Sequence, residues 1–405
     1  STLSKSVVIR YGSSVEFPFF FLHCTMQHLK SQFLLNPEIT FLNFGSFGAC
    51  PKPIFEDYIR WQYLLESEPV QFIAFDGAQY LQKAREALAQ YVHCEADDVV
   101  LVTNPSYAVN AIAKSFPLQA GDEILTTNIE YGACDKTWNY YCKKAGAMYR
   151  QHKIQFPIQS KETLVEEFFK EVNANTKLIF VSHITSSTGL ILPVEEICRK
   201  AKALGIPTFV DGAHVPGQIP LDLGNLDADY YTGACHKWMM TPKGCSFLYV
   251  RKELQKQVDP LVISWGYDSA MPSHSQYLDY HQMNGTRDFS AMLTIPKAIE
   301  FMQEHQWPEV ARHCRTLVQD NAQRFCKVLK TEPLCPIHDD FIAQLYSTRI
   351  QLSEPEKFQR MLFEKYRIEV PITRMGNDFF IRYSINAFNT QQDLDALYEA
   401  LENEL

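Results

Sequence analysis

The chain has 405 residues, 46% of them hydrophobic and 21% charged, as expected for a globular protein with enough apolar material for more than one domain. Acidic residues outnumber basic ones by 47 to 38 without runs of Lys or Arg, which disfavours nucleic acid or an anionic membrane as the main partner. The eleven cysteines are scattered without metal-binding spacing and predict reduced thiols in a cytoplasmic protein without a metal site.

The N-terminal segment is the first feature in chain order. We expect residues 1–33 to form an extension that is poorly ordered. Its apolar patch, 17–22, is interrupted by a proline, and neither the charge order nor the cleavage site of a signal peptide accompanies it. Our hypothesis is that Met26 is the natural start. No later stretch approaches the roughly 18 to 20 apolar residues of a membrane span.

From residue 99 onward, short β-branched or apolar runs alternate with segments of helical periodicity. The predicted strands are 99–103, 123–128, 177–184, 207–211, 228–233 and 245–250. Helices are expected at 106–116, 131–146 and 193–205. This alternation predicts an α/β fold with a mostly parallel sheet, in which ligands gather at the carboxyl ends of the strands.

The pattern changes after about residue 290. Two amphipathic helices are predicted at 291–305 and 310–330, followed by alternating strands within 341–350 and 378–385. We therefore expect a large domain over 34–290 and a smaller α+β domain over 291–405.

Polar side chains follow several of the predicted strands. Thr103, Asn104 and Ser106 open the helix after the first of these strands, where N–H groups and the helix dipole suit a phosphate, although such residues also serve as simple caps. Asp211 ends an apolar strand. Its carboxylate could cap a helix, bind magnesium or hold a proton on a heterocyclic nitrogen.

Lys237 follows the next strand, 26 residues after Asp211, in the stretch "TGACHKWMMTPKG". It could simply cover Trp238 with its aliphatic stem. However, an aspartate and a lysine on consecutive strand ends, with a phosphate cradle on an earlier one, is the layout that pyridoxal 5'-phosphate requires. The lysine forms a Schiff base with the aldehyde, and the aspartate keeps the pyridine nitrogen protonated.

Larger motifs resemble a known family. The D-G-A-H and H-K-W pair at this spacing is similar to the class V aminotransferase family of fold-type I pyridoxal-phosphate enzymes. The stretches "FLNFGSFGACPKPI", "EPVQFI", "HKWMMTPKG" and "NGTRDFSAML" most resemble its isopenicillin N epimerase-like and hercynylcysteine sulfoxide lyase-like branch. The resemblance extends from about residue 34 to the end of the chain.

The resemblance implies roles for individual cofactor-binding residues. Lys237 would form the Schiff base and later move protons, Asp211 would pair with the pyridine nitrogen, and Tyr131 would stack on the ring. The other implied cofactor contacts are Ser106, Tyr107 and His236 for the phosphate, and Ser186 and His214 for the phenolic oxygen.

It also implies the substrate site and the assembly. Arg382 would bind the α-carboxylate of the substrate through two parallel hydrogen bonds. The segment from Asn43 to Phe47 would form part of the substrate entrance, although its glycines are equally suited to turns. Thr286 would reach the phosphate in a neighbouring subunit, which implies a homodimer with shared active sites.

Two departures from the family pattern matter. Ala234 stands where many relatives place a serine or asparagine that contacts the phosphate, so that contact must come from elsewhere. Cysteine desulfurases need a mobile cysteine nucleophile in the region of residues 363–384, and this chain has none there. Persulfide chemistry is therefore disfavoured.

These observations predict a pyridoxal-phosphate enzyme that acts at the α-carbon of an amino acid or an amino-acid-derived thioether, in the manner of isopenicillin N epimerase. After Lys237 removes the α-proton, epimerisation, β-elimination of a thiol and transamination all remain open, because the residues named above serve all three. Another hypothesis is a non-catalytic module that keeps the fold. A nucleotide-binding enzyme is disfavoured, because the sequence contains neither G-x-G-x-x-G nor G-x-x-x-x-G-K-[ST].

Overall fold

The computed structural model describes residues 29–405. Most of the predicted N-terminal extension, with Met26 and the apolar patch, therefore lies outside the described residues. Within its last five positions, Leu29 and Phe33 are buried against the rest of the chain. The proposed domain boundaries stay predictions. Among residues 29–405, no helix combines the length and the apolar character that a membrane crossing requires.

Seven strands of the described chain form one large sheet with the order β2-β8-β7-β6-β5-β3-β4. Only β8 runs antiparallel to its neighbours, which confirms the predicted α/β class with a mostly parallel sheet. The strands, in sheet order, are β2 (Val99–Val102), β8 (Ser246–Val250), β7 (Tyr230–Ala234), β6 (Thr208–Asp211), β5 (Thr176–Ser182), β3 (Glu123–Thr127) and β4 (Met148–His152).

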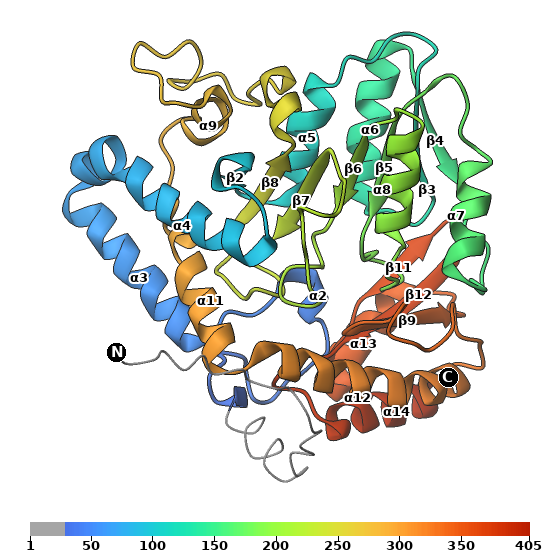
Figure 1. Ribbon diagram of the computed structural model, residues 1–405. Coiled ribbons are helices and arrows are strands. Elements are labelled where there is room, and N and C mark those ends of the chain that lie inside the picture. Colours follow the sequence, from blue (N-terminus) through green and yellow to red (C-terminus); the bar gives the residue numbers. More distant parts are fainter. Residues whose placement is uncertain (1–28) are drawn as a thin grey trace, which may run out of the picture.

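Helices cover both faces of this sheet, as expected for strands without a solvent-facing side (Figure 1). Along β2, Val100 and Val102 pack into one apolar cluster with α5 and α6, whereas Val99 and Leu101 pack into a second cluster on the opposite face. The first cluster includes residues of α5 (Pro105–Ser115) and α6 (Gly132–Ala145), and the second includes residues of α7 (Lys161–Phe169) and α8 (Val194–Ala203). The carboxyl ends of the parallel strands therefore meet at one edge of a rigid core.

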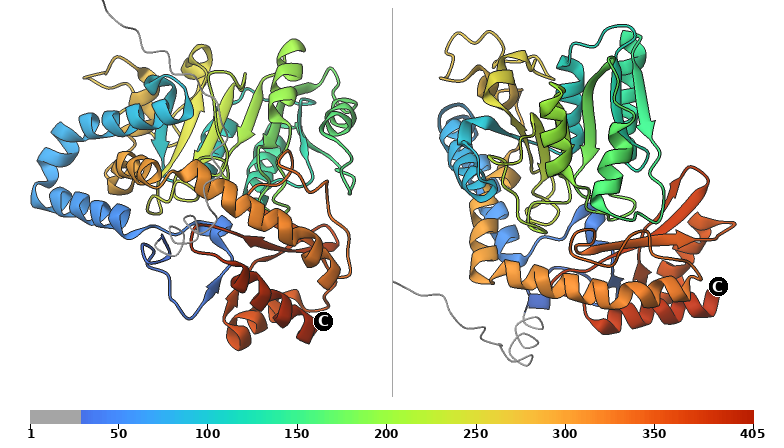
Figure 2. Two further views of the ribbon diagram at one scale, coloured as in Figure 1. Left: turned by 60° about the horizontal axis from the view of Figure 1, so that its bottom comes forward. Right: turned by 45° about the vertical axis from the view of Figure 1, so that its right-hand side comes forward.

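A smaller sheet with the order β11-β12-β9 follows the long helix α12 (Trp307–Val328) and lies beside the large sheet (Figure 2). Its elements are β9 (Leu345–Ile350), α13 (Pro355–Tyr366), β11 (Ile372–Met375), β12 (Asp378–Ser384) and α14 (Gln391–Glu404). Early residues join this unit through the parallel pairing of β1 (Thr40–Phe41) with β10 (Ile368–Glu369). The short helix α2 (Phe44–Phe47) follows β1 and lies between the two units (Figure 1).

Helices α3 and α4 form an arm that projects away from the large sheet (Figures 1 and 2). The arm consists of α3 (Lys52–Ser67), a π-helical segment (Gln71–Asp76) and α4 (Gly77–Val92), and it packs on α10 (Ser290–Leu293) and α11 (Ile295–Glu304). Tyr63, Val70 and Phe75 are exposed large apolar side chains on the arm. A monomer would leave this apolar surface in water.

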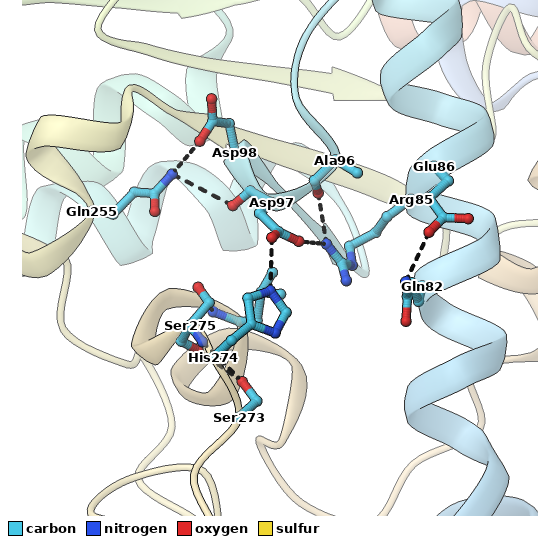
Figure 3. Close-up of polar contacts among 11 residues, drawn as sticks. Gln82, Arg85, Glu86, Ala96, Asp97, Asp98, Gln255, Ser273, His274 and Ser275 are labelled. Atoms are coloured by element: carbon cyan, nitrogen blue, oxygen red, sulfur yellow. Dashed lines mark hydrogen bonds and ion pairs between the residues drawn. The ribbon is translucent and has the colours of Figure 1, made fainter.

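A polar cluster anchors the loop that precedes α9 (Gln276–Gln282) to the arm and to the start of β2 (Figure 3). The Arg85 guanidinium donates to Asp97 Oδ1 at 3.0 Å and to the carbonyl of Ala96 at 2.6 Å. The other carboxylate oxygen of Asp97 lies 2.7 Å from Nε2 of His274, which belongs to the loop. This contact helps to fix the segment that leads to residues 284–287.

Candidate active site

A cavity of about 400 Å³ opens at the carboxyl edge of the large sheet. Its wall includes Thr103 after β2, Ser182 at the end of β5, Asp211 at the end of β6 and Lys237 after β7. Its volume is in the range of small-molecule and cofactor sites. The topology therefore brings the polar strand ends predicted from the sequence to one place.

Lys237 lies in the turn that follows β7. Burial lowers the pKa of its ammonium to about 8, with Arg382 acting in the same direction and Asp211 opposing the shift. Gly48 crosses this turn so closely, at φ 65°, that a Cβ there would lie 2.3 Å from the carbonyl oxygen of His236. The close approach therefore requires glycine at position 48 and places the segment after α2 against the lysine.

Asp211 is a buried carboxylate at the end of β6. Its Oδ1 accepts the Ala213 N–H at 3.0 Å, and its Oδ2 lies 3.6 Å from the thiol sulfur of Cys134. Burial raises the pKa of Asp211, while the Ala213 N–H and the charge of Lys237 counteract the rise. The carboxylate thus has few protein donors and faces a cavity that Lys237 also lines, an arrangement suited to pairing with a protonated group of a ligand.

Two histidines flank the lysine. His214 Nε2 lies 3.0 Å from Lys237 Nζ, and its Nδ1 lies 3.3 Å from the indole nitrogen of Trp238. His236 Nδ1 lies 2.9 Å from the carbonyl oxygen of Cys245, and burial lowers the pKa of His236 to about 4. Because a carbonyl only accepts, Nδ1 of His236 carries the proton and Nε2 is the nitrogen left without one.

Residues at the start of α5 both cap the helix and line the cavity. Asn104 caps the helix, because its side chain accepts the Tyr107 N–H at 2.8 Å. Thr103, Asn104 and Ser106 nevertheless line the cavity, so the positive end of the helix dipole faces it. The hydroxyl of Tyr107 instead accepts a hydrogen bond from Asn284 at 3.1 Å, and Tyr107 is absent from the cavity wall.

Tyr131 immediately precedes α6 and lies at the rim of the cavity with 48% of its surface exposed. Glu130 beside it is buried, which the sequence reasoning missed. Its carboxylate accepts the Ser182 N–H at 2.8 Å and lies 2.6 Å from the Thr127 hydroxyl. Burial raises the pKa of Glu130 to about 8, and Asp211 adds to the rise. The clue to Glu130 that the sequence offered was its position directly before Tyr131, the aromatic residue at the rim of the cavity.

Arg382 lies on β12 of the smaller sheet and is buried. Its guanidinium contacts the carbonyl and hydroxyl of Ser186, Oδ1 of Asn43 at 3.5 Å and Oγ of Ser46 at 3.3 Å. Burial lowers its pKa to about 10, and its Nε has no hydrogen-bond partner among the described residues. A buried guanidinium held by neutral oxygens is prepared for an external carboxylate.

The remaining predicted residues lie around these groups. Ser186 lines the cavity, and Phe47 lies at its edge with 71% of its surface exposed. Asn43 lies beneath Arg382 and orients Ser46 through a 2.6 Å hydrogen bond. Thr286 is exposed and does not line the cavity of its own chain. Ser46, which belongs to the predicted entrance segment, and Lys243, which was not predicted, also line the cavity.

Known proteins were compared with the chain. The family profile described as Aminotransferase class-V matches residues 66–397. Isopenicillin N epimerase of Amycolatopsis lactamdurans is 31% identical over 386 residues, covering 92% of this chain and 97% of that protein. L-cysteine desulfhydrase of Arabidopsis thaliana is 27% identical over 282 residues, or 65% of this chain and 61% of that protein.

A solved structure shares the fold. A mutant of C-DES with glycine covalently linked to its pyridoxal-phosphate cofactor superposes with a TM-score of 0.78 at 20% sequence identity. The superposition covers 92% of this chain and 99% of that one. The likeness confirms the predicted fold-type I architecture.

Proposed function

Because the chain belongs to the class-V aminotransferase family and is a pyridoxal-phosphate-dependent enzyme, we propose that it acts at the α-carbon of an amino acid or an amino-acid-derived thioether. The observation that carries this proposal is that Lys237 and Asp211 line one cavity and that Arg382 lies directly behind its wall, in contact with Ser186 and Ser46. A partly desolvated amine, a buried carboxylate and a guanidinium without a carboxylate partner form the minimum set for this chemistry.

The residues present fit the cofactor. The pKa of Lys237 is lowered to about 8, so about a tenth of its amine is uncharged and nucleophilic at pH 7, far more than for an ordinary lysine. Asp211 would hold the protonated ring nitrogen, and Tyr131 would cover one face of the ring. Ser106 and the start of α5 would hold the phosphate, since a helix N-terminus suits an anion. When bound, the cofactor supplies an electron sink that makes the α-hydrogen of an attached amino acid acidic.

His236 is proposed to contact the phosphate, and its protonation matters for that contact. With Nδ1–H donating to the carbonyl of Cys245, neutral His236 presents only an acceptor at Nε2. It therefore donates to a phosphate only after Nε2 takes up a proton. A nearby anion raises the pKa of an imidazole, so phosphate binding itself favours that state.

Lys237 and Arg382 would act on different groups of the substrate. Arg382 would hold the α-carboxylate, with Ser186, Ser46 and Asn43 fixing the plane of the guanidinium. This orientation presents the α-hydrogen to Lys237 Nζ, which would accept the proton and return it. His214 and Ser186 would support the cofactor's phenolic oxygen, and Phe47 would form part of the entrance.

Epimerisation is the outcome we propose, because an isopenicillin N epimerase matches nearly the whole chain. β-Elimination with release of a thiol is the second candidate, because an L-cysteine desulfhydrase matches about two thirds of the chain. Transfer of sulfur to an enzyme cysteine is not proposed, because residues 363–384 contain no cysteine.

A homodimer with shared active sites is part of this proposal. Thr286 is exposed and lies outside the cavity of its own chain, as a residue that serves a second subunit would. Exposed apolar side chains occur both on the arm and in the loop before α9, where 85% of Trp265 and 86% of Met271 are accessible. A second copy of the chain would cover such surfaces.

Incubation of the enzyme with amino acids and cysteine conjugates in deuterated water distinguishes the outcomes. Epimerisation produces the mirror-image amino acid with deuterium at Cα, elimination produces a thiol and a 2-oxo acid, and transamination produces a 2-oxo acid that retains its β-substituent. Retention of Cα–H in every compound, with wild-type enzyme that binds the cofactor, would contradict the proposed function.

A further inference from the structure

Lys237, His214 and Trp238 form a chain of contacts that begins in the cavity and ends in the core. Nζ of Lys237 lies 3.0 Å from Nε2 of His214, whose Nδ1 lies 3.3 Å from Nε1 of Trp238. Trp238 is 1% exposed and His214 2% exposed. The indole also packs on Phe44 of α2, with ring centroids 4.9 Å apart. The imidazole therefore has a fixed neighbour at each nitrogen.

The chemistry of these three groups restricts where the protons lie. An indole N–H is only a donor, so Nδ1 of His214 must offer its lone pair to Trp238. In a neutral imidazole the single proton then resides on Nε2. This N–H points at Lys237 Nζ, which can accept it only as an uncharged amine, because an ammonium has three donors and no lone pair.

We infer that Trp238 is a positioning residue that holds His214 in the Nε2–H tautomer, so that His214 donates a hydrogen bond to Lys237 and favours its uncharged amine. The opposite tautomer would present a lone pair to Lys237 and favour the ammonium. It would also place two N–H donors against each other at the contact with Trp238. The inference rests on the role proposed for Lys237, whose uncharged amine is both nucleophile and base.

Neutral His214 is consistent with its surroundings. Burial places its pKa well below the usual value, and the charge of Arg382, together with that of Lys237 or His236 whenever either is protonated, lowers it further. Asp211 and Cys134 oppose the loss of charge at Lys237, whereas Arg382 promotes it. The groups that act on the pair thus come from β6, α6 and β12 and from the turn of Lys237 itself.

The first experiment observes the tautomer directly. In the full chain without cofactor, labelled with ¹⁵N-histidine, protonated and bare ring nitrogens resonate in separate ranges. The spectrum at about pH 9, above the pKa of about 8 of Lys237, should show His214 with a protonated Nε2 and a bare Nδ1. His214→Asn identifies the resonances, and the response to Trp238→Phe is an alternative means of identification. A proton on Nδ1, or on both nitrogens, would overturn the inference.

The second experiment removes the indole N–H and keeps an aromatic ring. Trp238→Phe should allow the Nδ1–H tautomer and move the pH profile for capture of pyridoxal phosphate by Lys237 to higher pH. We expect capture to be roughly three- to tenfold slower on the acid side, equivalent to about half to one pH unit. Visible absorbance of the captured cofactor measures the rate.

Trp307→Phe is the matched control. Trp307 is similarly buried, and its indole N–H donates to the carbonyl of Gly217 at 3.1 Å instead of to a histidine. This variant should keep both the tautomer and the pH profile of the wild type. A folded Trp238→Phe variant with an unchanged tautomer and profile contradicts the inference.

Two remaining outcomes are also decisive. If Trp238→Phe does not fold, the wild-type spectrum decides, because Nε2 protonation supports the inference and Nδ1 protonation contradicts it. If the wild type captures no pyridoxal phosphate, the role proposed for Lys237 fails, whereas the tautomer of His214 is still measured independently.

Discussion

The thiol sulfur of Cys134 lies 3.6 Å from Oδ2 of Asp211, so the carboxylate proposed to hold the cofactor's ring nitrogen is itself held from α6. With the Ala213 N–H on the other oxygen, this contact fixes the carboxylate in the wall of the cavity. Cys134 is buried, and a buried cysteine ordinarily serves packing alone. Its contact with Asp211 gives it a positioning role as well.

Cys134→Ala should therefore weaken cofactor binding. Loss of one weak hydrogen bond to a buried carboxylate is expected to cost on the order of 1 kcal/mol, or roughly fivefold in the dissociation constant. Titration of the apoprotein with pyridoxal phosphate measures the effect. Cys142→Ala removes a buried thiol from the same helix that has no contact with Asp211, and it should bind the cofactor like the wild type. Equal affinities for all three proteins would show that Cys134 only packs.

Arg382→Lys should impair substrate use and spare the cofactor. A single ammonium cannot reproduce two parallel hydrogen bonds to a carboxylate, so kcat/KM should fall roughly 100-fold, or about 3 kcal/mol. The visible spectrum of the bound cofactor should persist. Arg374→Lys is the control, because this exposed arginine lies on neighbouring β11 and its side chain donates a hydrogen bond to the carbonyl of Gly376, away from the cavity wall. A normal kcat/KM in Arg382→Lys would remove Arg382 from the substrate site.

Glu130 predicts a pH dependence of stability. The folded state keeps the Glu130 proton up to a pKa of about 8, whereas the unfolded chain releases it near the ordinary glutamate pKa of 4.5. Between these values the folded state binds more protons, so this group makes the free energy of unfolding fall as pH rises. Glu130→Gln should lack that part of the slope. Urea unfolding of both proteins at several pH values measures it, and parallel curves would mean that Glu130 is ionised throughout.

Shared active sites predict complementation between two defective chains. Lys237→Ala lacks the cofactor lysine, and Thr286→Trp should block the contact that each chain gives to its partner. A heterodimer of these chains has one intact site, so random mixing should restore roughly a quarter of the wild-type activity. Co-expression with two different affinity tags isolates the heterodimer. Absence of any recovery in an isolated heterodimer would contradict shared sites.

Secondary-structure elements could be predicted from the sequence where the pattern of apolar residues within the element itself indicates it. The runs at 99–103 and 207–211 are apolar because both faces of these strands are buried, and they became the edge strand β2 and the central strand β6. The edge strand β4, with the sequence MYRQH, was missed because one edge of the sheet leaves it partly exposed and charged. The amphipathic helices α3 and α4 of the arm were also not identified, since their role depends on contacts that no local pattern specifies.

The residues of the candidate site likewise include some that could be predicted from the sequence and some whose contacts could not. Asp211 and Lys237 could be identified because each follows an apolar strand at a spacing that matches a known family. The contact of Ser46 with Arg382 could not be predicted, since it forms only after residues 336 positions apart in the sequence are brought together. The contact of Trp238 with His214 likewise depends on the turn after β7, so the sequence suggested only that a lysine lies beside a tryptophan.

The most direct test of the account is the visible spectrum of the purified protein with pyridoxal phosphate, compared with that of Lys237→Ala. We predict a yellow Schiff-base band in the wild type that borohydride reduction fixes to Lys237, and no such band in the variant. A wild type without the band, or a variant that retains it, would contradict the assignment of Lys237 as the cofactor lysine.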